Sequence, residues 1–316
     1  MSKSINVLEG IQEKLGGNKV VYAKGADLVD KHWPESEIFP EPMDARELAM
    51  MDSAVQITRK SDMAIVVLGG NTKTAGENKS RTSLDLPGHQ LELIQAIKAT
   101  GKPVIVVLIG SQPMTINWIN RYIDGIIYAG YPGAKGGKAI ADVLFGDYNP
   151  GGKLTLTFPK SVGQLPFNFP SKPNAQSDDG EQAKIKGLLY PFGFGLSYTT
   201  FSYSNLKINV DSLTPESEIK VSVDICNTGK AKGDEVVQLY LRDMVSSVTT
   251  YEKLLKGFER VHLDPNEKKT VQFSVPREEL KLYNRKMQFV LEPGEFKVMV
   301  GSSSADIRQE GRFTIK

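Results

Sequence analysis

The apolar run MAIVVLGG, residues 63–70, decides the fold of the first half of this chain. It is continuously apolar rather than alternating, as a strand buried on both faces must be. Three further runs share this character, namely KVVYAKG (19–25), PVIVVLIG (103–110) and GIIYAGYPG (125–133). We expect all of these runs to be strands of one sheet that is covered on both faces.

Stretches of helical character lie between these runs, from Asp44 to Lys60, from Gly88 to Thr100 and from Gly137 to Leu144. Their apolar residues are Ala45, Leu48, Ala49 and Val55 in the first, Leu91, Ile94 and Ile97 in the second, and Ile140, Val143 and Leu144 in the third. Strands and helices that alternate in this way predict a mostly parallel sheet covered by helices.

A different pattern runs from about Phe201 to the end of the chain. Ile219, Val221, Val223 and Ile225 alternate with polar neighbours, which is the period of a strand with one buried face. Similar stretches follow, and turn signals separate them: DEVVQLYLRD, KKTVQFSV, KMQFVLEPG and GEFKVMVGS, with NTGK, LDPNE and EPGE as the turns. This half predicts an antiparallel β-sandwich of about 110 residues.

These two patterns divide the chain into residues 1–160, a joining segment 161–200 that we interpret as a wrapping linker, and residues 201–316. The linker is long for a loop within a compact domain. It ends in the aromatic stretch LLYPFGFGLSYTTF, which a flexible spacer would not need. We expect this end to pack against a domain surface, with sugar stacking by one of its rings as the alternative.

Composition excludes several classes of protein. The 39 basic and 37 acidic side chains give a net charge of +2 without a basic stripe, so nucleic-acid binding has no electrostatic support. Cys226 is the only cysteine, which leaves no intrachain disulfide and no cysteine metal cluster. No apolar run has the length of a bilayer span or a signal peptide, so we expect a soluble chain with no membrane contact and no export signal of its own.

Neither a cofactor motif nor a metal motif is found. The stretch GYPGAKGGKA (130–139) fails as a phosphate loop, because Pro132 replaces its first glycine and Ala139 follows Lys138. We interpret its glycines as a close-range turn from strand to helix. The three histidines, His32, His89 and His262, are far apart in sequence, and we expect His89, near a helix start, to be solvated. We predict no cofactor and no metal.

The segment 69–87 is the strongest candidate for a functional loop. It leaves the carboxyl end of a predicted parallel strand, where ligand sites collect, and its length of about eighteen residues exceeds the usual two to six. Glu77 is its only glutamate, Arg81 follows four residues later, and Asp85 lies near a helix start, where we expect a structural role. From spacing alone Glu77 is most simply a solvated residue, with catalysis as the alternative.

At these residues the sequence resembles the C-terminal half of glycoside hydrolase family 3, the β-glucosidase and β-xylosidase family, and its bacterial members in particular. The stretches that carry the resemblance span most of the chain: SDMAIVVLGG with GENKSRTSLDLPGHQLELI, ADVLFGDYNPGGKLTLTFP, LLYPFGFGLSYTTF, and VSVDICNTGKAKGDEVVQLYLRD with LKGFERVHLDPNE and EPGEFKVMVGSSSADI. The resemblance implies an α/β sandwich domain with a mostly parallel sheet, then an all-β fibronectin type III-like (immunoglobulin-like) sandwich. The family's N-terminal (β/α)8 barrel is missing.

The resemblance also implies a chemistry. Family members hydrolyse glycosides with retention, using an aspartate nucleophile on the barrel and a glutamate acid/base on a sandwich-domain loop. Around that glutamate the family pattern is Gly-Glu-Gly-x-Asp-Arg, and here it is Gly76-Glu77-Asn78-Lys79-Ser80-Arg81, so Asn78 and Ser80 depart from it. The resemblance therefore makes Glu77 the general acid/base and Arg81 a substrate-binding residue.

The resemblance implies a β-glucoside or oligosaccharide substrate and a barrel domain as the partner, without which we expect the chain to be inactive. Two alternatives stay open, a β-xylosidase part and a non-catalytic carbohydrate-binding or scaffold protein. An exposed row of two or three rings in the sandwich would favour the binding protein, although we expect its aromatic residues to be mostly core. These are Tyr240, Tyr251, Phe258, Phe273, Tyr283, Phe289, Phe296 and Phe313. A homo-oligomer is also left open, and family relatives are often periplasmic or secreted.

Overall fold

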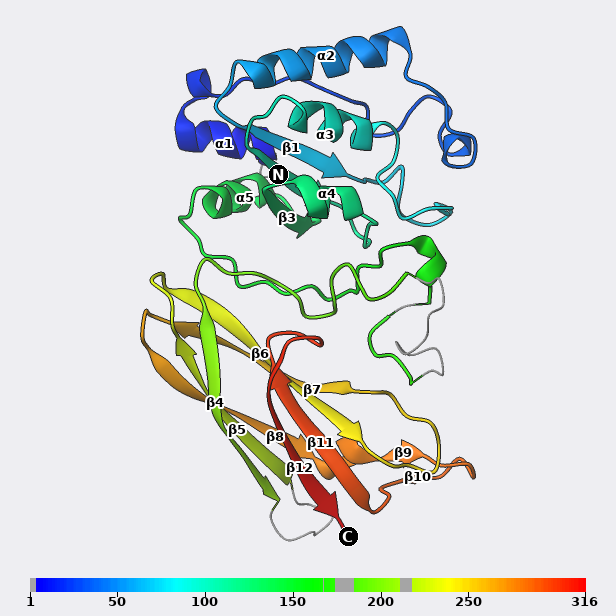
Figure 1. Ribbon diagram of the computed structural model, residues 1–316, viewed down its shortest axis with the longest axis vertical. Helices are drawn as coiled ribbons and strands as arrows, with labels where there is room; N and C mark the ends of the chain where they lie inside the picture. The colour runs from blue at the N-terminus through cyan, green and yellow to red at the C-terminus, as the bar shows by residue number, and fades with distance from the viewer. Residues whose placement is uncertain (1–3, 167, 174–184, 211–217) are drawn as a thin grey trace. The chain divides into compact units, whose positions relative to one another are not determined.

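The structure is a computed structural model that describes residues 4–166, 168–173, 185–210 and 218–316 (Figure 1). The chain divides into two compact units. The first is Met1–Tyr148 with Phe158–Leu165, and the second is Asn149–Thr157 with Pro166–Lys316. Each unit has a hydrophobic core of its own. The domain boundaries at 160 and 200 stay predictions.

A parallel sheet forms the centre of the first unit. Its strands are β1 (Ala64–Gly69), β2 (Val104–Ile109) and β3 (Gly125–Gly130), in that spatial order. Helices α2 and α3 lie on one side of this sheet and α1 and α5 on the other (Figure 1). The helices are α1 (Val7–Leu15), α2 (Ala45–Arg59), α3 (Gln90–Lys98), α4 (Asn117–Tyr122) and α5 (Gly136–Leu144), with short 3-10 turns η1 (Gly17–Lys19), η2 (Glu35–Glu37) and η3 (Val162–Gln164). The predicted parallel sheet covered by helices is confirmed.

The predicted strand at 19–25 is wrong. Residues 20–25 form no strand, and Val21 and Tyr22 are 64% and 66% exposed. Only Val20 of this run packs against the core around α1 and α5. A strand of a doubly covered sheet must bury consecutive residues on both faces, and this run, with lysines at both ends, buries too little of its apolar surface to do so.

The buried face of α2 also differs from the prediction, although its bounds agree. The helix buries Glu47, Ala54 and Thr58, whereas Leu48 is exposed. Asp44 caps the helix by accepting from the Glu47 N–H, and the Glu47 side chain in turn accepts from the Asp44 N–H. This capping box directs Glu47 inward, so that a polar side chain occupies part of the buried face of the helix.

Glycines allow α1 and α5 to approach closely. A Cβ on Gly137 would lie 1.9 Å from the Asn6 carbonyl oxygen, and one on Gly10 would lie 2.2 Å from the Gly137 oxygen. Gly133, just before α5, has a φ of +74°, which suits glycine. The stretch GYPGAKGGKA therefore turns the chain from β3 to α5 at close range, as the sequence suggested.

The second unit is an antiparallel β-sandwich. One sheet has the order β12-β11-β6-β7, the other β4-β5-β8, and β9 and β10 form a separate hairpin (Figure 1). The strands are β4 (Phe201–Val210), β5 (Glu218–Asn227), β6 (Gly233–Asp243), β7 (Leu254–Leu263), β8 (Lys268–Pro276), β9 (Leu282–Tyr283), β10 (Phe289–Val290), β11 (Gly294–Gly301) and β12 (Ile307–Ile315), with the 3-10 turn η4 (Arg277–Leu280) between β8 and β9. The alternating residues of β5 are buried in the core between the sheets, as predicted.

The aromatic end of the joining segment packs on this sandwich. Phe192 stacks on Phe169 with ring centroids 4.5 Å apart, and Phe169 meets Tyr240 of β6 edge-on at 5.6 Å. The Gly193 N–H donates to the Leu154 carbonyl at 2.7 Å. The expected packing against a domain surface is confirmed.

In the ranges that the structure describes, every helix is too short or too polar to cross a bilayer.

One carboxylate ties three strands of the sandwich together. Asp224 of β5 accepts from Lys268 and Thr270 at 2.7 and 2.6 Å, and from Asn205 of β4 at 2.7 Å. The hydrogen bond from Lys268, followed by those from Thr270 and Asn205, holds the pKa of Asp224 well below its ordinary value of 3.8.

We predict that Asp224→Asn destabilises the sandwich at neutral pH and that its deficit shrinks in acid. A lowered carboxylate pKa stabilises the fold above the unfolded value of 3.8, and this stabilisation is lost as the pH falls below it. Urea denaturation followed by circular dichroism at about pH 7 and about pH 3 measures the difference. Asp264→Asn, at an exposed turn residue, is the control, and equal deficits at both pH values would contradict the prediction.

Candidate active site

The long loop between β1 and α3, residues 70–89, leaves the carboxyl edge of the parallel sheet. A hollow beside it is formed by the ends of the strands and by the loop itself. Its lining residues are Gly69, Gly70, Thr74, Ala75, Arg81, Pro87, Gly110, Ser111, Gln112, Met114 and Tyr131. The carboxyl edge is where ligand sites of open α/β sheets form, so loop and hollow together are the candidate site.

The side chain of Gln90 joins the two ends of this loop. Its Oε1 accepts from the Gly69 N–H at 2.7 Å, and its Nε2 donates to the Gly69 carbonyl at 2.9 Å and to the Leu28 carbonyl at 3.0 Å. Gln90 is only 3% exposed, and its amide is satisfied by these backbone groups. The Gln90 side chain thereby fixes three places of the chain together: Gly69 at the end of β1, Gln90 at the start of α3, and Leu28.

The loop leaves β1 through a residue that must be glycine. Gly69 has a φ of +129°, and a Cβ there would lie 1.9 Å from the Ile109 carbonyl oxygen. Thr74 is then buried, where its hydroxyl accepts from the Asn71 N–H at 3.1 Å and donates to the Asn71 carbonyl at 3.1 Å. The first part of the loop is therefore ordered up to Thr74.

Glu77 lies at the corner of a turn and is exposed. The Lys79 N–H donates to the Gly76 carbonyl at 3.2 Å, and the flanking residues Gly76 and Asn78 have φ angles of +135° and +58°. Asparagine is the residue other than glycine that best tolerates this left-handed conformation at the third position of a turn. Asn78 therefore fits the backbone at the place where the family pattern has glycine, and this departure leaves the turn intact.

Arg81 is held by partners within the chain. Its Nε donates to Glu37, and the two side chains are only 9% and 7% exposed. Its guanidinium carbon lies 5.0 Å from the centre of the Trp33 ring, and its Nη2 donates to the Asp85 carbonyl at 2.9 Å. Arg81 also lines the hollow, which is where a ligand would bind. Its contact with substrate stays a prediction.

Asp85 stabilises the second part of the loop. Its carboxylate accepts from the hydroxyls of Ser83, at 2.8 Å, and Thr115, and the Thr115 N–H donates to the Leu84 carbonyl at 3.0 Å. These contacts tie the loop to the segment after β2. They agree with the structural role expected of Asp85.

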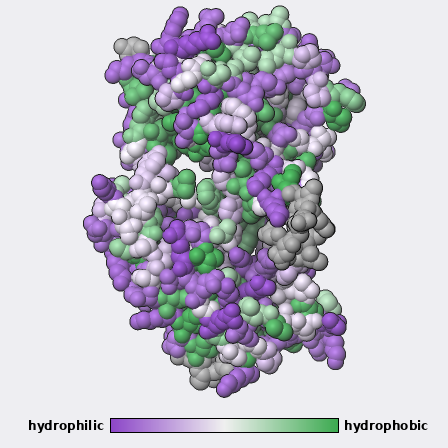
Figure 2. Space-filling model, in the orientation of Figure 1, coloured by the Kyte–Doolittle hydropathy of each residue, from purple (hydrophilic) through white to green (hydrophobic). Residues whose placement is uncertain are grey.

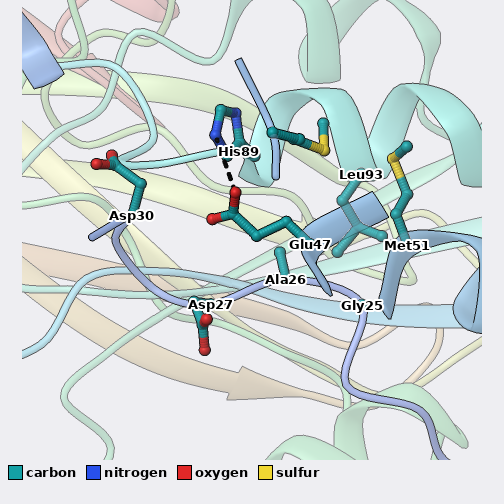
Figure 3. A pocket seen from close by; sticks show the side chains of 9 residues that line it. Gly25, Ala26, Asp27, Asp30, Glu47, Met51, His89 and Leu93 are labelled. Carbon is teal, nitrogen blue, oxygen red and sulfur yellow. Dashed lines mark ion pairs between the residues drawn. The ribbon is translucent and has the colours of Figure 1, made fainter. Parts of the chain in front are cut away.

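The expectation that His89 is solvated is wrong. Its side chain is 16% exposed in a small pocket between α2 and α3, where Nε2 lies 3.9 Å from an oxygen of Glu47 and Nδ1 lies 3.7 Å from Glu92 (Figure 3). The pocket is lined by Gly25, Ala26, Asp27, Asp30, Met43, Glu47, Met51, His89 and Leu93. Sequence placed His89 at a helix start but could not show that the inward face of α2 covers it.

The chemistry that this arrangement offers is that of the Glu77 carboxyl, exposed at the tip of an anchored loop, whereas the Asp85 carboxylate is bound by Ser83 and Thr115. A carboxyl group at such a place can donate and accept a proton. Among the residues that the structure describes, no three His, Cys, Asp or Glu side chains are grouped as metal ligands. Retaining glycoside hydrolysis needs a second carboxylate about 5 Å from the first.

Comparison with known proteins identifies related sequences. Residues 1–198 match the glycosyl hydrolase family 3 C-terminal domain, and residues 235–304 match the fibronectin type III-like domain. A β-xylosidase of Formosa agariphila is 44% identical over 99% of this chain, and a periplasmic β-glucosidase of Salmonella typhimurium is 40% identical over 98%. Both alignments cover 42% of the relative, so the chain spans less than half the length of these curated proteins.

A solved structure of a related protein has the same fold over this chain. The β-glucosidase of Erythrobacter marinus superposes with a TM-score of 0.87 and 34% identity. The alignment covers 100% of this chain and 44% of the other. The α/β fold followed by a fibronectin type III-like sandwich is therefore shared with less than half of that β-glucosidase.

We predict that Gln90→Ala lowers the free energy of unfolding of the first unit by about 1–3 kcal/mol, since it leaves buried Gly69 groups without partners. Urea denaturation followed by tryptophan fluorescence tests this, because Trp33 and Trp118 both lie in the first unit. Gln95→Ala on the same helix is the matched control. A Gln90→Ala chain as stable as the control would show that the hydrogen bonds of the Gln90 side chain contribute nothing to the stability of the first unit.

Proposed function

This chain belongs to glycoside hydrolase family 3, and we propose that it is the C-terminal part of a retaining β-glucosidase in which Glu77 is the general acid/base. The observation that carries the proposal is the place of Glu77, exposed at the tip of a loop that is anchored at the carboxyl edge of the sheet. A general acid must reach a substrate held elsewhere while keeping a defined position, and this loop meets both needs.

The proposed reaction uses a second carboxylate outside this chain. Glu77 protonates the glycosidic oxygen as an aspartate of a (β/α)8 barrel attacks the anomeric carbon and forms a glycosyl-enzyme. Glu77 then takes a proton from water, which attacks the anomeric carbon and releases the sugar with retained configuration. The substrate is a terminal β-D-glucosyl residue of an oligosaccharide or glycoside, and the chain alone is inactive because one carboxylate cannot complete both steps.

Four exposed apolar side chains of the first unit are candidates for contact with a barrel partner. Val21, Tyr22, Ile38 and Phe39 are all well exposed, and apolar side chains mark a protein contact where they gather in one patch. Their sequence positions precede the Glu77 loop. On the face seen in Figure 2, hydrophobic residues are scattered among hydrophilic ones rather than gathered in one broad field.

β-Xylosidase activity is the second candidate within the same mechanism. Its support is the 44% identity to a protein named β-xylosidase, compared with 40% to one named periplasmic β-glucosidase. The proposal includes a periplasmic or secreted location for the whole protein, on the name of the second relative.

A carbohydrate-binding role has one specific observation in its favour. The expectation that the sandwich aromatics are mostly core is wrong for Tyr251, Phe258, Tyr283 and Phe289, which are exposed. Tyr283 and Phe289 are cross-strand partners in the β9–β10 hairpin, 59% and 48% exposed, with ring centroids 5.0 Å apart. Exposed neighbouring rings can stack on sugar faces, although cross-strand aromatic pairs also stabilise hairpins.

We predict that Glu77→Ala lowers hydrolysis of p-nitrophenyl β-glucoside by about 10²–10⁴-fold when this chain is combined with a family barrel domain. Azide should restore turnover and yield the β-glycosyl azide, because this nucleophile needs no general base to attack the glycosyl-enzyme. The β-xyloside, assayed in parallel, separates the two sugars.

The matched control is Glu41→Gln, at an exposed glutamate of the same unit, which should keep full activity. Robust activity of the chain without the barrel would mean that the nucleophile lies within these residues. A Glu77→Ala variant as active as the control would exclude Glu77 as the acid/base.

If the β9–β10 hairpin binds glycans, the chain is retained on insoluble cellulose or xylan and the double variant Tyr283→Ala/Phe289→Ala is not. Phe258→Ala removes another exposed ring, on β7, and should leave retention unchanged. Equal retention of both variants would assign the ring pair to hairpin stability alone.

A further inference from the structure

We propose that Glu37 is a positioning residue for Glu77. Through Arg81 and Thr82, its carboxylate fixes the second end of the loop tip on which Glu77 lies. The inference rests on the proposed function for the role of Glu77, while the contacts that support it belong to this chain alone.

Both oxygens of the Glu37 carboxylate bind the Glu77 loop. Oε1 accepts from the Nε of Arg81. Oε2 accepts from the Thr82 N–H at 2.8 Å and from the Thr82 hydroxyl at 3.1 Å. Burying a carboxylate costs free energy unless it is hydrogen-bonded. The Glu37 side chain is 7% exposed, and all of these partners come from one short stretch of the loop.

The Trp33 ring orients the other member of this pair. The guanidinium carbon of Arg81 lies 5.0 Å from the ring centre, and Nη2 reaches the Asp85 carbonyl. A planar guanidinium held by a ring face and two acceptors has little freedom to move, which lysine could not reproduce. Arg81 is therefore fixed in direction as well as in charge.

The segment 28–37, which carries Trp33 and Glu37, is itself anchored. At its start, the Leu28 carbonyl accepts from Gln90, and a Cβ on Gly88 would lie 3.1 Å from the Val29 Cα. At its end, η2 presents Glu37 to residues 81 and 82. The segment thus contacts the loop at two places and holds the distance between them.

Between its anchors the loop has a short free tip. Thr74 is buried on one side and Arg81 on the other, and residues 76–80 between them are all exposed. Glu77 is part of this tip, so its position depends on both ends. If the Arg81 end is released, only the Thr74 end and the turn at Gly76–Lys79 still restrain the carboxyl.

The first test uses this chain as it is and measures amide hydrogen exchange of residues 75–85. We expect Glu37→Gln to speed exchange there by about tenfold, most of all at the Thr82 amide, without changing the strands of the sheet. Glu35→Gln, on the same 3-10 turn but exposed, is the matched control. Exchange equal to the control overturns the proposal. Should Glu37→Gln fail to fold, Arg81→Lys replaces it, with the same expected result.

The second test separates positioning from mere stability by the leaving group. With a barrel domain present, loss of acid assistance slows a phenyl glucoside, a poor leaving group, far more than a 2,4-dinitrophenyl glucoside, which needs no acid. The difference appears in kcat/KM, which reports formation of the glycosyl-enzyme, because loss of Glu77 as the base slows the second step equally for both substrates. We expect Glu77→Gln to show this difference strongly and Glu37→Gln to show it by about tenfold in kcat/KM, with Glu37→Asp intermediate.

The outcomes distinguish the two hypotheses. If Glu77→Gln shows the leaving-group difference and Glu37→Gln does not, the positioning role is wrong and the proposed function stands. If Glu77→Gln itself shows no difference, the proposed function is wrong, and Glu37 is then a structural residue only.

Discussion

The first unit depends on a side-chain amide that takes the place of a backbone partner. Gln90 accepts from the Gly69 N–H and donates to the Gly69 carbonyl, which are the last polar groups of an edge strand. The same amide also binds the Leu28 carbonyl. A strand end, a helix start and a distant segment are therefore fixed together, and the entropy of closing the long loop between Gly69 and Gln90 is offset at its two ends.

Because its ends are fixed, a polar loop can be ordered without a hydrophobic core of its own. Thr74 folds back onto Asn71, and Asp85 binds Ser83 and Thr115. The ion pair between Arg81 and Glu37 adds a connection across 44 residues of sequence. These polar contacts leave the tip around Glu77, residues 76–80, exposed between two fixed ends, so the carboxyl is both anchored and accessible.

The strands of the first unit and the candidate residue Glu77 could be predicted from the sequence, and the predictions that were wrong have physical reasons. The runs at 63–70, 103–110 and 125–133 became strands, as continuous apolar composition predicts, and the central strand β2 is the most fully buried of them. The run at 19–25 did not, because its four apolar residues, Val20 to Ala23, do not cover two faces. Glu77 could be chosen as a candidate from loop length and sheet edge alone, since the carboxyl ends of parallel strands define where ligands bind.

The residues that hold Glu77 in place could not be found in this way. Gln90 and Glu37 act on partners 21 and 44 residues away, and a single sequence carries no sign that such polar groups meet. The exposed rings of Tyr283 and Phe289 were missed for a related reason, because two-residue strands are too short to show an alternating pattern. Sequence reading thus recovers burial better than it recovers specific polar pairing.

Under the proposed function, the mechanism of a two-carboxylate enzyme gives a reason for such anchors to belong to this chain. The carboxyl groups must lie about 5 Å apart, and a misplacement of about 1 Å can slow catalysis by a hundredfold. If the Glu77 loop became ordered only when a barrel domain docked, its conformational entropy would be subtracted from the free energy of docking. A loop fixed beforehand by Gln90, Thr74 and the Glu37–Arg81 pair avoids that loss and presents the acid at a defined place. Under the proposed function, the buried polar contacts of the first unit order the loop that carries Glu77 before any partner domain docks.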